Sequence, residues 1–160
     1  MKLNEKKTKN LIFNFTKKYQ FTTKLNVNNV NINLPNEAKL LGTVLTDKLT
    51  WDRNTEEIVK KAYKRMQLLH AAATFTSSKK DLKDIYQTFK RSVLEQSAVV
   101  WHSSLTNKNR SELERVQKGA VRVIMGQNHK TYTNSLKILK LDTLEKRKAM
   151  SAIYQEMYNE

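Results

Sequence analysis

Residues 78–105 carry two apolar stripes on one predicted helix, and no other stretch of the chain constrains the fold as strongly. The first stripe recurs at helical spacing and consists of Leu82, Ile85, Tyr86, Phe89, Val93 and Val100. The second lies about 130° further round the helix, in its later half only, and consists of Leu94, Ala98, Trp101 and Leu105. A helix that is apolar on two sides needs more than one neighbour to cover it. We therefore expect this helix to be central in a helical bundle.

The start of this central helix is predicted by Ser78 and Asp81, whose three-residue spacing is typical of a capping box. Another helix is expected to precede it, with Asp52 or Asn54 as its cap. The inward-facing residues of that earlier helix are predicted to be Ile58, Val59, Ala62, Met66, Leu69 and Ala73. The two helices are separated by residues 74–78, which interrupt the pattern.

A third helix is expected after Thr106 or Asn107, either of which can cap it, and its end is predicted at Gly126. The residues predicted to face inward are Leu113, Val116, Ala120, Val123 and Ile124. Two shorter helices are predicted over residues 133–139 and 142–158. The helical part of the chain therefore extends from about residue 51 to the C-terminal region.

The first quarter of the chain is predicted to form strands, because apolar and polar residues alternate there with a period of two. The alternating residues are Phe21, Thr23, Leu25 and Val27, followed by Val30, Ile32 and Leu34. Asn28 and Asn29 lie between the two runs, and asparagine tolerates positive φ, so a tight hairpin turn is expected there. Pro35 ends the second run, and residues 40–45 predict one more strand with Gly42 inside it.

The charge of the chain favours a polyanionic partner. Thirty Lys and Arg residues against 15 Asp and Glu residues give a formal net charge of +15, which attracts nucleic acid without determining a fold. An anionic membrane surface is the competing interpretation, but it usually requires a clustered basic run beside an apolar segment. The sequence contains no cysteine, which excludes disulfides and thiolate metal sites. No transmembrane segment or signal peptide is predicted.

The sequence offers little for catalysis. His70, His102 and His129 lie on separate predicted segments, without cysteines or paired carboxylates at metal-ligand spacing. Three glycines do not form a phosphate-binding loop or a nucleophile elbow. The acidic residues are expected to act as helix caps, as first-turn charges, or as partners of nearby lysines and arginines. We therefore predict no metal site and no catalytic residue from the residues themselves.

The basic faces of the predicted helices are the positive signal. Lys60 and Lys64 lie opposite the apolar stripe of their helix. Arg115, Lys118 and Arg122 lie within about 60° of one another, opposite the apolar stripe of theirs. Such faces are often only solvated surface, but two of them on a strongly basic chain favour binding to a phosphate backbone. Trp51 and Trp101 suggest base stacking as well, although Trp101 lies on an apolar stripe and is expected in the core.

Four sequence strings resemble a known family. MKLNEKKTKNLIFNF is similar to the segment after the catalytic strand pair of a reverse transcriptase palm, and KLLGTVLTDKLTWDRNTEEIVKKA to the strand near the primer grip and the start of the thumb. SVLEQSAVVWHSSLT and ELERVQKGAVRVIMG resemble helices typical of non-LTR (LINE-like, jockey-type) retrotransposon enzymes. The similarity covers residues 2–146, and from about residue 148 the sequence departs from the family.

The resemblance implies a thumb that grips the template and primer backbone. It also places Lys7 at the position of the family lysine proposed to protonate the leaving pyrophosphate. The metal-binding aspartates of the family should lie upstream of Met1, and no Asp-Asp pair occurs in the chain. Two-metal phosphoryl transfer needs such carboxylates. We therefore expect no polymerase activity from this chain alone, and a divalent metal, Mg²⁺, only in a complete polymerase.

Together these observations predict an α+β protein with a short antiparallel β hairpin unit followed by a mainly helical thumb-like bundle. Residues 1–50 would be the end of a palm, residues 51–126 the bundle and residues 127–160 a helical extension. The expected partner is RNA and DNA as a template-primer duplex, with no membrane, in the nucleus or cytoplasm. The alternative is a non-enzymatic basic helical module that docks on a partner or self-associates through the truncated palm edge.

Overall fold

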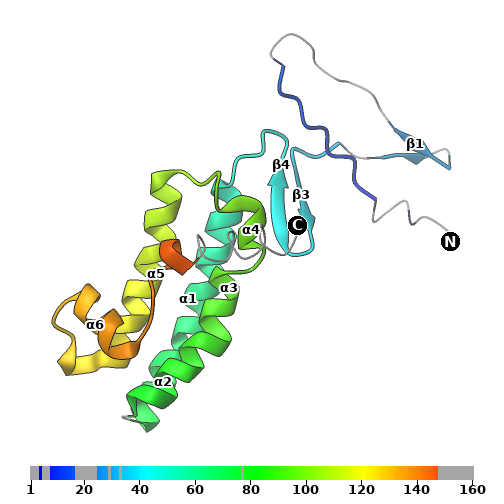
Figure 1. Ribbon diagram of the computed structural model, residues 1–160. Helices are drawn as coiled ribbons and strands as arrows, with labels where there is room; N and C mark the ends of the chain where they lie inside the picture. The colour runs from blue at the N-terminus through cyan, green and yellow to red at the C-terminus, as the bar shows by residue number, and fades with distance from the viewer. Residues whose placement is uncertain are drawn as a thin grey trace, which may run out of the picture. The chain divides into compact units, whose positions relative to one another are not determined.

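The computed structural model of the protein describes residues 4, 8–16, 25–28, 30–32, 34–76 and 78–147. Its contacts divide the chain into two compact units, Met1–Asn54 and Thr55–Glu160. The first unit contains two antiparallel hairpins and the second is mostly helical, so the predicted α+β class is confirmed (Figure 1). The predictions made for Lys7, for Phe21 and Thr23, and for residues 148–158 lie outside the described residues.

The first hairpin pairs β1 (Asn26–Val27) with β2 (Val30–Asn31), with Val27 opposite Val30. Asn28, the residue directly after β1, has a φ of +50°. The turn predicted there is therefore confirmed, and the ability of asparagine to adopt positive φ at low cost explains it. A backbone hydrogen bond of 2.8 Å from Ile32 N–H to the Leu25 carbonyl extends the pairing beyond β2.

The second hairpin corrects the prediction of a single strand over residues 40–45. The structure instead pairs β3 (Glu37–Leu40) with β4 (Thr43–Thr46), and the chain turns at Leu41 and Gly42. These two residues have φ values of +48° and +86°, as a two-residue hairpin loop often requires. Leucine rarely adopts a positive φ, and Leu41-Gly42 is not the Asn-Gly or Asp-Gly pair that usually indicates this turn. The turn was therefore not predicted from the local sequence.

The helical elements begin with α1 (Asp52–Phe75), whose first three residues belong to the first unit. The others are α2 (Lys79–Ile85), the π-helical η2 (Tyr86–Arg91), α3 (Ser92–Leu94), α4 (Ala98–Trp101), α5 (Asn107–Met125), the 3₁₀ turn η3 (Gly126–Asn128) and α6 (Tyr132–Leu139). Residues 144–147 form one more helical turn. Among the described residues, no helix has the length and apolar character that crossing a membrane requires.

The predicted continuous helix over residues 78–105 is wrong in its second half. The chain forms a turn at residues 95–97, where Ser97 has a φ of +52°, and helix resumes only in α4. This break rotates the later residues, so that Val100 is 62% exposed while Trp101 is fully buried. The Trp101 indole Nε1–H donates to the Gln96 carbonyl at 3.1 Å and holds the turn in place.

Most of the helix ends have the cap that the sequence predicted. Ser78 accepts from the Asp81 N–H at 3.3 Å, and Thr106 accepts from the Asn109 N–H at 3.2 Å, as predicted. The Ser78 N–H, however, donates to the Thr76 hydroxyl rather than to a capping-box carboxylate. Asn54 is not a cap, because its Oδ1 accepts from the Val44 N–H at 3.1 Å within the first unit. Asp52 is the first residue of α1 and the acidic residue of its first turn. The predicted end of α5 at Gly126 is confirmed, with a φ of +52°.

Helix α5 is the element around which the second unit packs. Its buried side chains are Asn109, Leu113, Val116, Gln117, Ala120, Val121, Ile124 and Met125. Four of them belong to one apolar cluster with leucines of α1, α2 and α6. The four are Ala120, Val121, Ile124 and Met125, and the leucines are Leu69, Leu82, Leu136 and Leu139. The buried stripe predicted for α5 is thus confirmed, apart from Val123, which is only partly buried.

Candidate nucleic-acid interface

The outer face of α5 presents a row of cations. Arg115, Lys118 and Arg122 are all exposed, as predicted, and they lie opposite the buried stripe. Lys108, which the sequence analysis missed, extends the row, because it precedes Arg115 by seven residues and therefore lies within about 20° of it. The seven-residue spacing of Lys108, Arg115 and Arg122 was the signal that could have revealed it. We call these four residues the α5 basic face.

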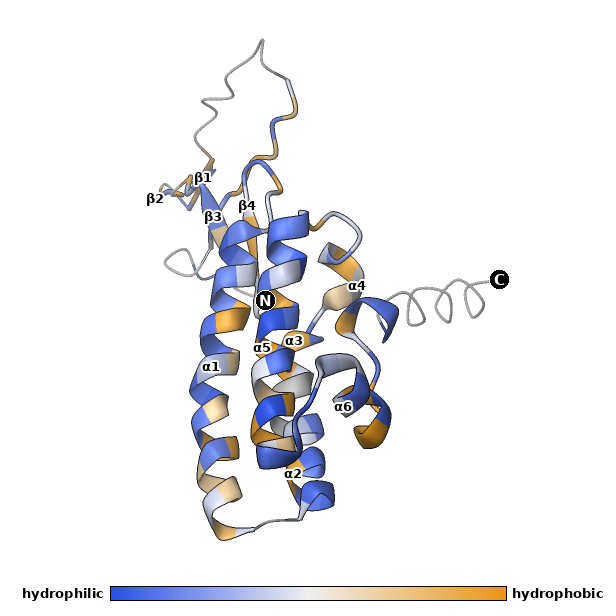
Figure 2. Ribbon diagram, turned by 90° about the vertical axis from the view of Figure 1, so that its left-hand side faces the viewer, coloured by the Kyte–Doolittle hydropathy of each residue, from blue (hydrophilic) through white to orange (hydrophobic). Residues whose placement is uncertain are grey.

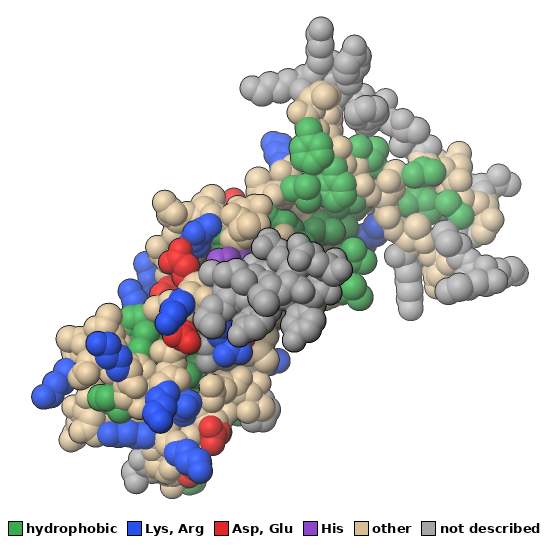
Figure 3. Space-filling model, in the orientation of Figure 1, with side chains coloured by type: hydrophobic (Ala, Val, Ile, Leu, Met, Phe, Trp, Pro, Cys, Tyr) green, Lys and Arg blue, Asp and Glu red, His purple; other side chains and the backbone are tan. Residues whose placement is uncertain are grey.

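Helix α1 carries the other two predicted residues on its own outer side. Lys60 and Lys64 are exposed, while Ala62 and Leu69 on the opposite side are buried. Helices α1 and α5 lie side by side (Figure 2), and a Cβ built on Gly119 of α5 would lie 3.1 Å from the Met66 side chain of α1. The two basic faces therefore belong to neighbouring helices, and Lys and Arg side chains far outnumber Asp and Glu on the part of the helical surface visible in Figure 3.

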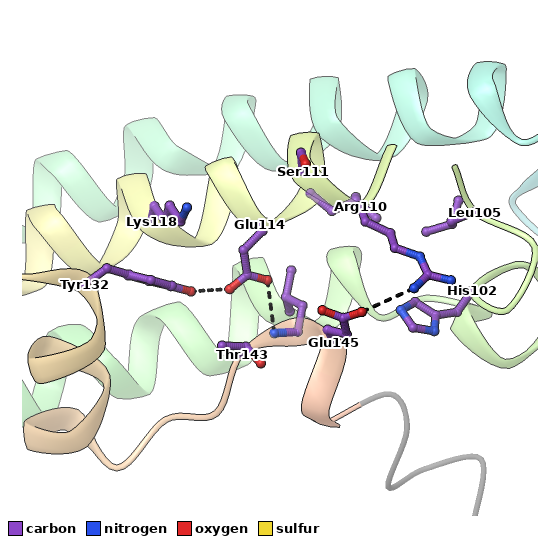
Figure 4. Close-up of a pocket in the computed structure, with 11 residues that line it drawn as sticks. His102, Leu105, Arg110, Ser111, Glu114, Lys118, Tyr132, Thr143 and Glu145 are labelled. Carbon is purple, nitrogen blue, oxygen red and sulfur yellow. Dashed lines mark hydrogen bonds and ion pairs between the residues drawn. The ribbon is translucent and has the colours of Figure 1, made fainter. Parts of the chain in front are cut away.

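Lys118 has a defined environment on the α5 basic face. Its ammonium lies over the Tyr132 ring, 5.4 Å from the ring centroid. The Tyr132 hydroxyl donates a short hydrogen bond to Glu114 Oε1, and the Leu144 N–H donates to Glu114 Oε2 at 3.2 Å (Figure 4). Burial, and then the Glu114 carboxylate, raises the pKa of Tyr132 above its usual range, so the hydroxyl stays protonated and remains a donor.

A buried glutamine connects this group to the core. Gln117 is fully buried; its amide nitrogen donates to the Tyr132 hydroxyl at 3.0 Å and to the Asp142 carbonyl at 2.9 Å. Its oxygen accepts from the hydroxyl of Tyr86, which is also fully buried, at 2.6 Å. The sequence analysis missed Gln117, although its positions relative to Leu113 and Val121, four residues away on either side, place it on the buried stripe.

The cavity beside this network has balanced charges. It has a volume of about 300 Å³ and is lined by residues of α5, by Tyr132, by His102 and by residues 143–145. Arg110 reaches Glu145 at 3.2 Å across it (Figure 4). Glu114 is held by the two hydrogen bonds described above. On its lining, Arg110 and Lys118 are matched by Glu114 and Glu145, so the cavity offers no excess positive charge to an anion. Lys108, Arg115 and Arg122 of the α5 basic face are not among its lining residues.

The tryptophans do not offer stacking surfaces. Trp101 is fully buried, as its place on an apolar stripe predicted, and Trp51 is only 8% exposed. Base stacking needs an accessible ring face. The interaction surface therefore consists of cations rather than aromatic rings.

The described residues do not suit a catalytic metal. No three His, Asp or Glu side chains gather among them in a way that could hold an ion. His129 instead shares a 2.9 Å hydrogen bond with the buried Ser135.

The comparisons with known proteins found no match, so a proposed function has to rest on the geometry of the described residues. The chain matches no protein-family model, no curated protein and no solved structure. The family resemblance of the sequence strings stays a hypothesis. The α5 basic face is the feature of the described residues that carries a functional argument furthest.

Proposed function

We propose that the helical unit Thr55–Glu160 binds the sugar-phosphate backbone of a nucleic acid duplex. The observation that carries this proposal is the α5 basic face, whose four cations are exposed on the side of the helix opposite its buried stripe. Binding through phosphates needs charge and position but little sequence readout. A net charge of +15 strengthens the attraction at long range.

The dimensions of α5 suit this role. Lys108 and Arg122 are fourteen residues apart, which corresponds to about 21 Å along the helix axis at 1.5 Å per residue. One strand of a duplex carries a phosphate about every 3.4 Å along its axis, so the row faces about six of them. Arg115, Lys118 and Arg122 lie within two turns of one another and can contact adjacent phosphates of one strand.

The resemblance to a reverse transcriptase gives this binding a context. In that context the helical unit acts as a thumb on a template-primer duplex inside the cell. The end of β3 and the whole of β4 lie in the string similar to the region near the primer grip. The aspartates that catalyse nucleotide addition would come from another part of the polymerase. The chain by itself is proposed to bind but not to polymerise.

The test is the salt dependence of binding to an RNA–DNA hybrid and to duplex DNA. If Lys60, Lys64, Arg115, Lys118 and Arg122 each neutralise one phosphate, the slope of log K against log salt should be about −4 to −5. Replacing Arg115, Lys118 and Arg122 together by glutamine should make the slope shallower by about 2.7 units for duplex DNA. The slope is measured by fluorescence anisotropy between 50 and 200 mM salt, roughly the range over which such slopes are resolved.

A matched control removes the same charge elsewhere. Lys80, Lys130 and Lys137 are exposed and lie outside the α5 basic face. Their combined replacement by glutamine should leave the slope near the wild-type value. Equal slopes for the two triple variants would show that only net charge matters, and an unchanged slope in the first variant would remove α5 from the interface.

A second candidate function is docking or self-association through the first unit. Its large exposed apolar residues include Leu25, Val30, Leu34, Leu40 and Leu41, and Leu41 is 88% exposed. Two-stranded hairpins are marginal alone, and exposed apolar surface favours association. This exposed apolar surface is the observation that supports the docking hypothesis.

Replacing Leu41 by asparagine is expected to test this candidate. Asparagine relieves about 1 kcal/mol of positive-φ strain and removes the most exposed leucine of the hairpin, so a self-associating protein should become more monomeric. Sedimentation velocity over a range of concentrations measures the change. Leu40→Asn removes exposed apolar surface at a neighbouring position without positive φ, so it separates the loss of apolar surface from the relief of strain. A wild-type chain that is monomeric at all concentrations would rule out self-association.

A further inference from the structure

Helix α5 places Glu114 four residues before Lys118, which is the order and spacing of a favourable helical ion pair. Pairing with nearby lysines and arginines was one of the roles expected of the acidic residues, beside helix capping and first-turn charges. Among the described residues, however, no carboxylate forms an ion pair with Lys118. The Lys118 ammonium lies over the Tyr132 ring, and both oxygens of Glu114 accept other hydrogen bonds (Figure 4).

The energies explain this arrangement. Glu114 accepts two hydrogen bonds, from the Tyr132 hydroxyl and the Leu144 N–H. Hydrogen bonds to a charged acceptor are stronger than an exposed helical ion pair of this spacing. The carboxylate is therefore held by the stronger partners, and the ammonium is attracted to the face of the ring instead.

We propose that Tyr132 is a positioning residue for phosphate binding by Lys118. Its hydroxyl, together with the Leu144 N–H, keeps Glu114 from pairing with Lys118, and its ring supports the ammonium. Lys118 is thereby kept available for a phosphate oxygen of the nucleic acid. This inference rests on the proposed function, because it assigns a role to one contact of the α5 basic face.

The geometry also allows the ring and a phosphate to be bound together. A cation over a ring face interacts through its charge, so its N–H groups that point away from the ring can still donate hydrogen bonds. Arg115 and Arg122 lie three residues before and four residues after Lys118, which makes all three neighbours on the helix surface. A phosphate bound at Lys118 can therefore also approach an arginine.

The test is a set of variants in the full-length chain, with the slope of log K against log salt for duplex DNA as the readout. Tyr132→Phe keeps the ring but releases Glu114, so the slope should become shallower by about 0.9, the contribution of one phosphate contact. Adding Lys118→Gln to Tyr132→Phe should change the slope no further. Adding Glu114→Gln to Tyr132→Phe should restore the wild-type slope, because a neutral amide does not pair with lysine.

The restoration by Glu114→Gln separates positioning from a general structural effect. If the role of Tyr132 were merely structural, the double variant of Tyr132→Phe with Glu114→Gln would be as impaired as Tyr132→Phe alone, and that result would overturn the inference. An unchanged slope in Tyr132→Phe would overturn it as well. If the triple replacement of Arg115, Lys118 and Arg122 does not alter the slope, the proposed function itself fails, which is a different outcome.

A measurement on the wild-type chain needs no variant that might unfold. NMR should show the Lys118 side-chain methylene protons shifted upfield by the Tyr132 ring current, both before and after addition of a DNA duplex. On addition of the duplex, the signal of the Lys118 ammonium should move. Absence of the ring-current shift would contradict the positioning role, even if the basic face binds DNA.

Discussion

Replacing Trp101 by alanine is expected to lower the free energy of unfolding by about 3 to 5 kcal/mol, the usual cost of removing a large buried aromatic side chain. Trp101 is fully buried, and its indole N–H donates to the Gln96 carbonyl at 3.1 Å. The replacement both opens a cavity and releases the turn at residues 95–97. Because this loss is comparable with the whole stability of a small domain, much of the variant should be unfolded at 37 °C.

The neighbouring residue provides the control. Val100 is 62% exposed, so Val100→Ala should change the free energy of unfolding by no more than about 0.5 kcal/mol. Urea denaturation followed by circular dichroism measures both variants. If residues 78–105 formed one continuous helix with Val100 on its buried stripe, Val100→Ala would destabilise the protein measurably, and that outcome would contradict the break at Ser97.

Replacing Gln117 by leucine is expected to destabilise the protein by about 2 to 4 kcal/mol, although leucine is similar in size and apolar. Buried polar groups that lose their partners each cost about 1 to 3 kcal/mol. The substitution removes the donor to the Asp142 carbonyl and the acceptor of the Tyr86 hydroxyl. A hydrophobic residue at this buried position is thus expected to weaken the fold, which a simple apolar-stripe argument would not predict.

A double-mutant cycle with Tyr86→Phe tests the cause. Removing the hydroxyl as well as its acceptor should recover part of the loss. The destabilisation of the double variant should therefore be smaller, by about 1 kcal/mol or more, than the sum of the two single destabilisations. The control is Gln67→Leu at an exposed position of α1, where a small effect is expected. Strict additivity between Gln117→Leu and Tyr86→Phe would show that the loss arises from packing alone.

Much of the fold could be predicted from short-range patterns. The buried stripes of α1 and α5, the caps at Ser78 and Thr106, the C-terminal glycine of α5 and the turn at Asn28 all depend on residues within about one turn of each other. The exposure of Arg115, Lys118 and Arg122 follows from the same periodicity. Lys108 was missed although its seven-residue spacing from Arg115 was present in the sequence.

Other features depended on which residues pair and pack, which the spacing of apolar residues does not show. The turn at Leu41 has no local signal, because leucine disfavours positive φ, and it exists because β3 and β4 pair on either side of it. The break at Ser97 comes with the burial of Trp101, whose indole N–H donates to the Gln96 carbonyl in the turn. Periodicity alone continues a strand through the first interruption and a helix through the second, since it counts spacing and not competing partners.

The sequence by itself therefore determined which residues are cationic, which face of each helix they share and that this face is exposed. Only the tertiary structure decided that Glu114 turns to Tyr132 and Leu144 rather than to Lys118. Those partners lie 18 and 30 residues away along the chain. The physical reason is that helical periodicity arises from neighbours within a few residues, whereas the choice among competing hydrogen-bond partners depends on which distant groups folding brings within reach.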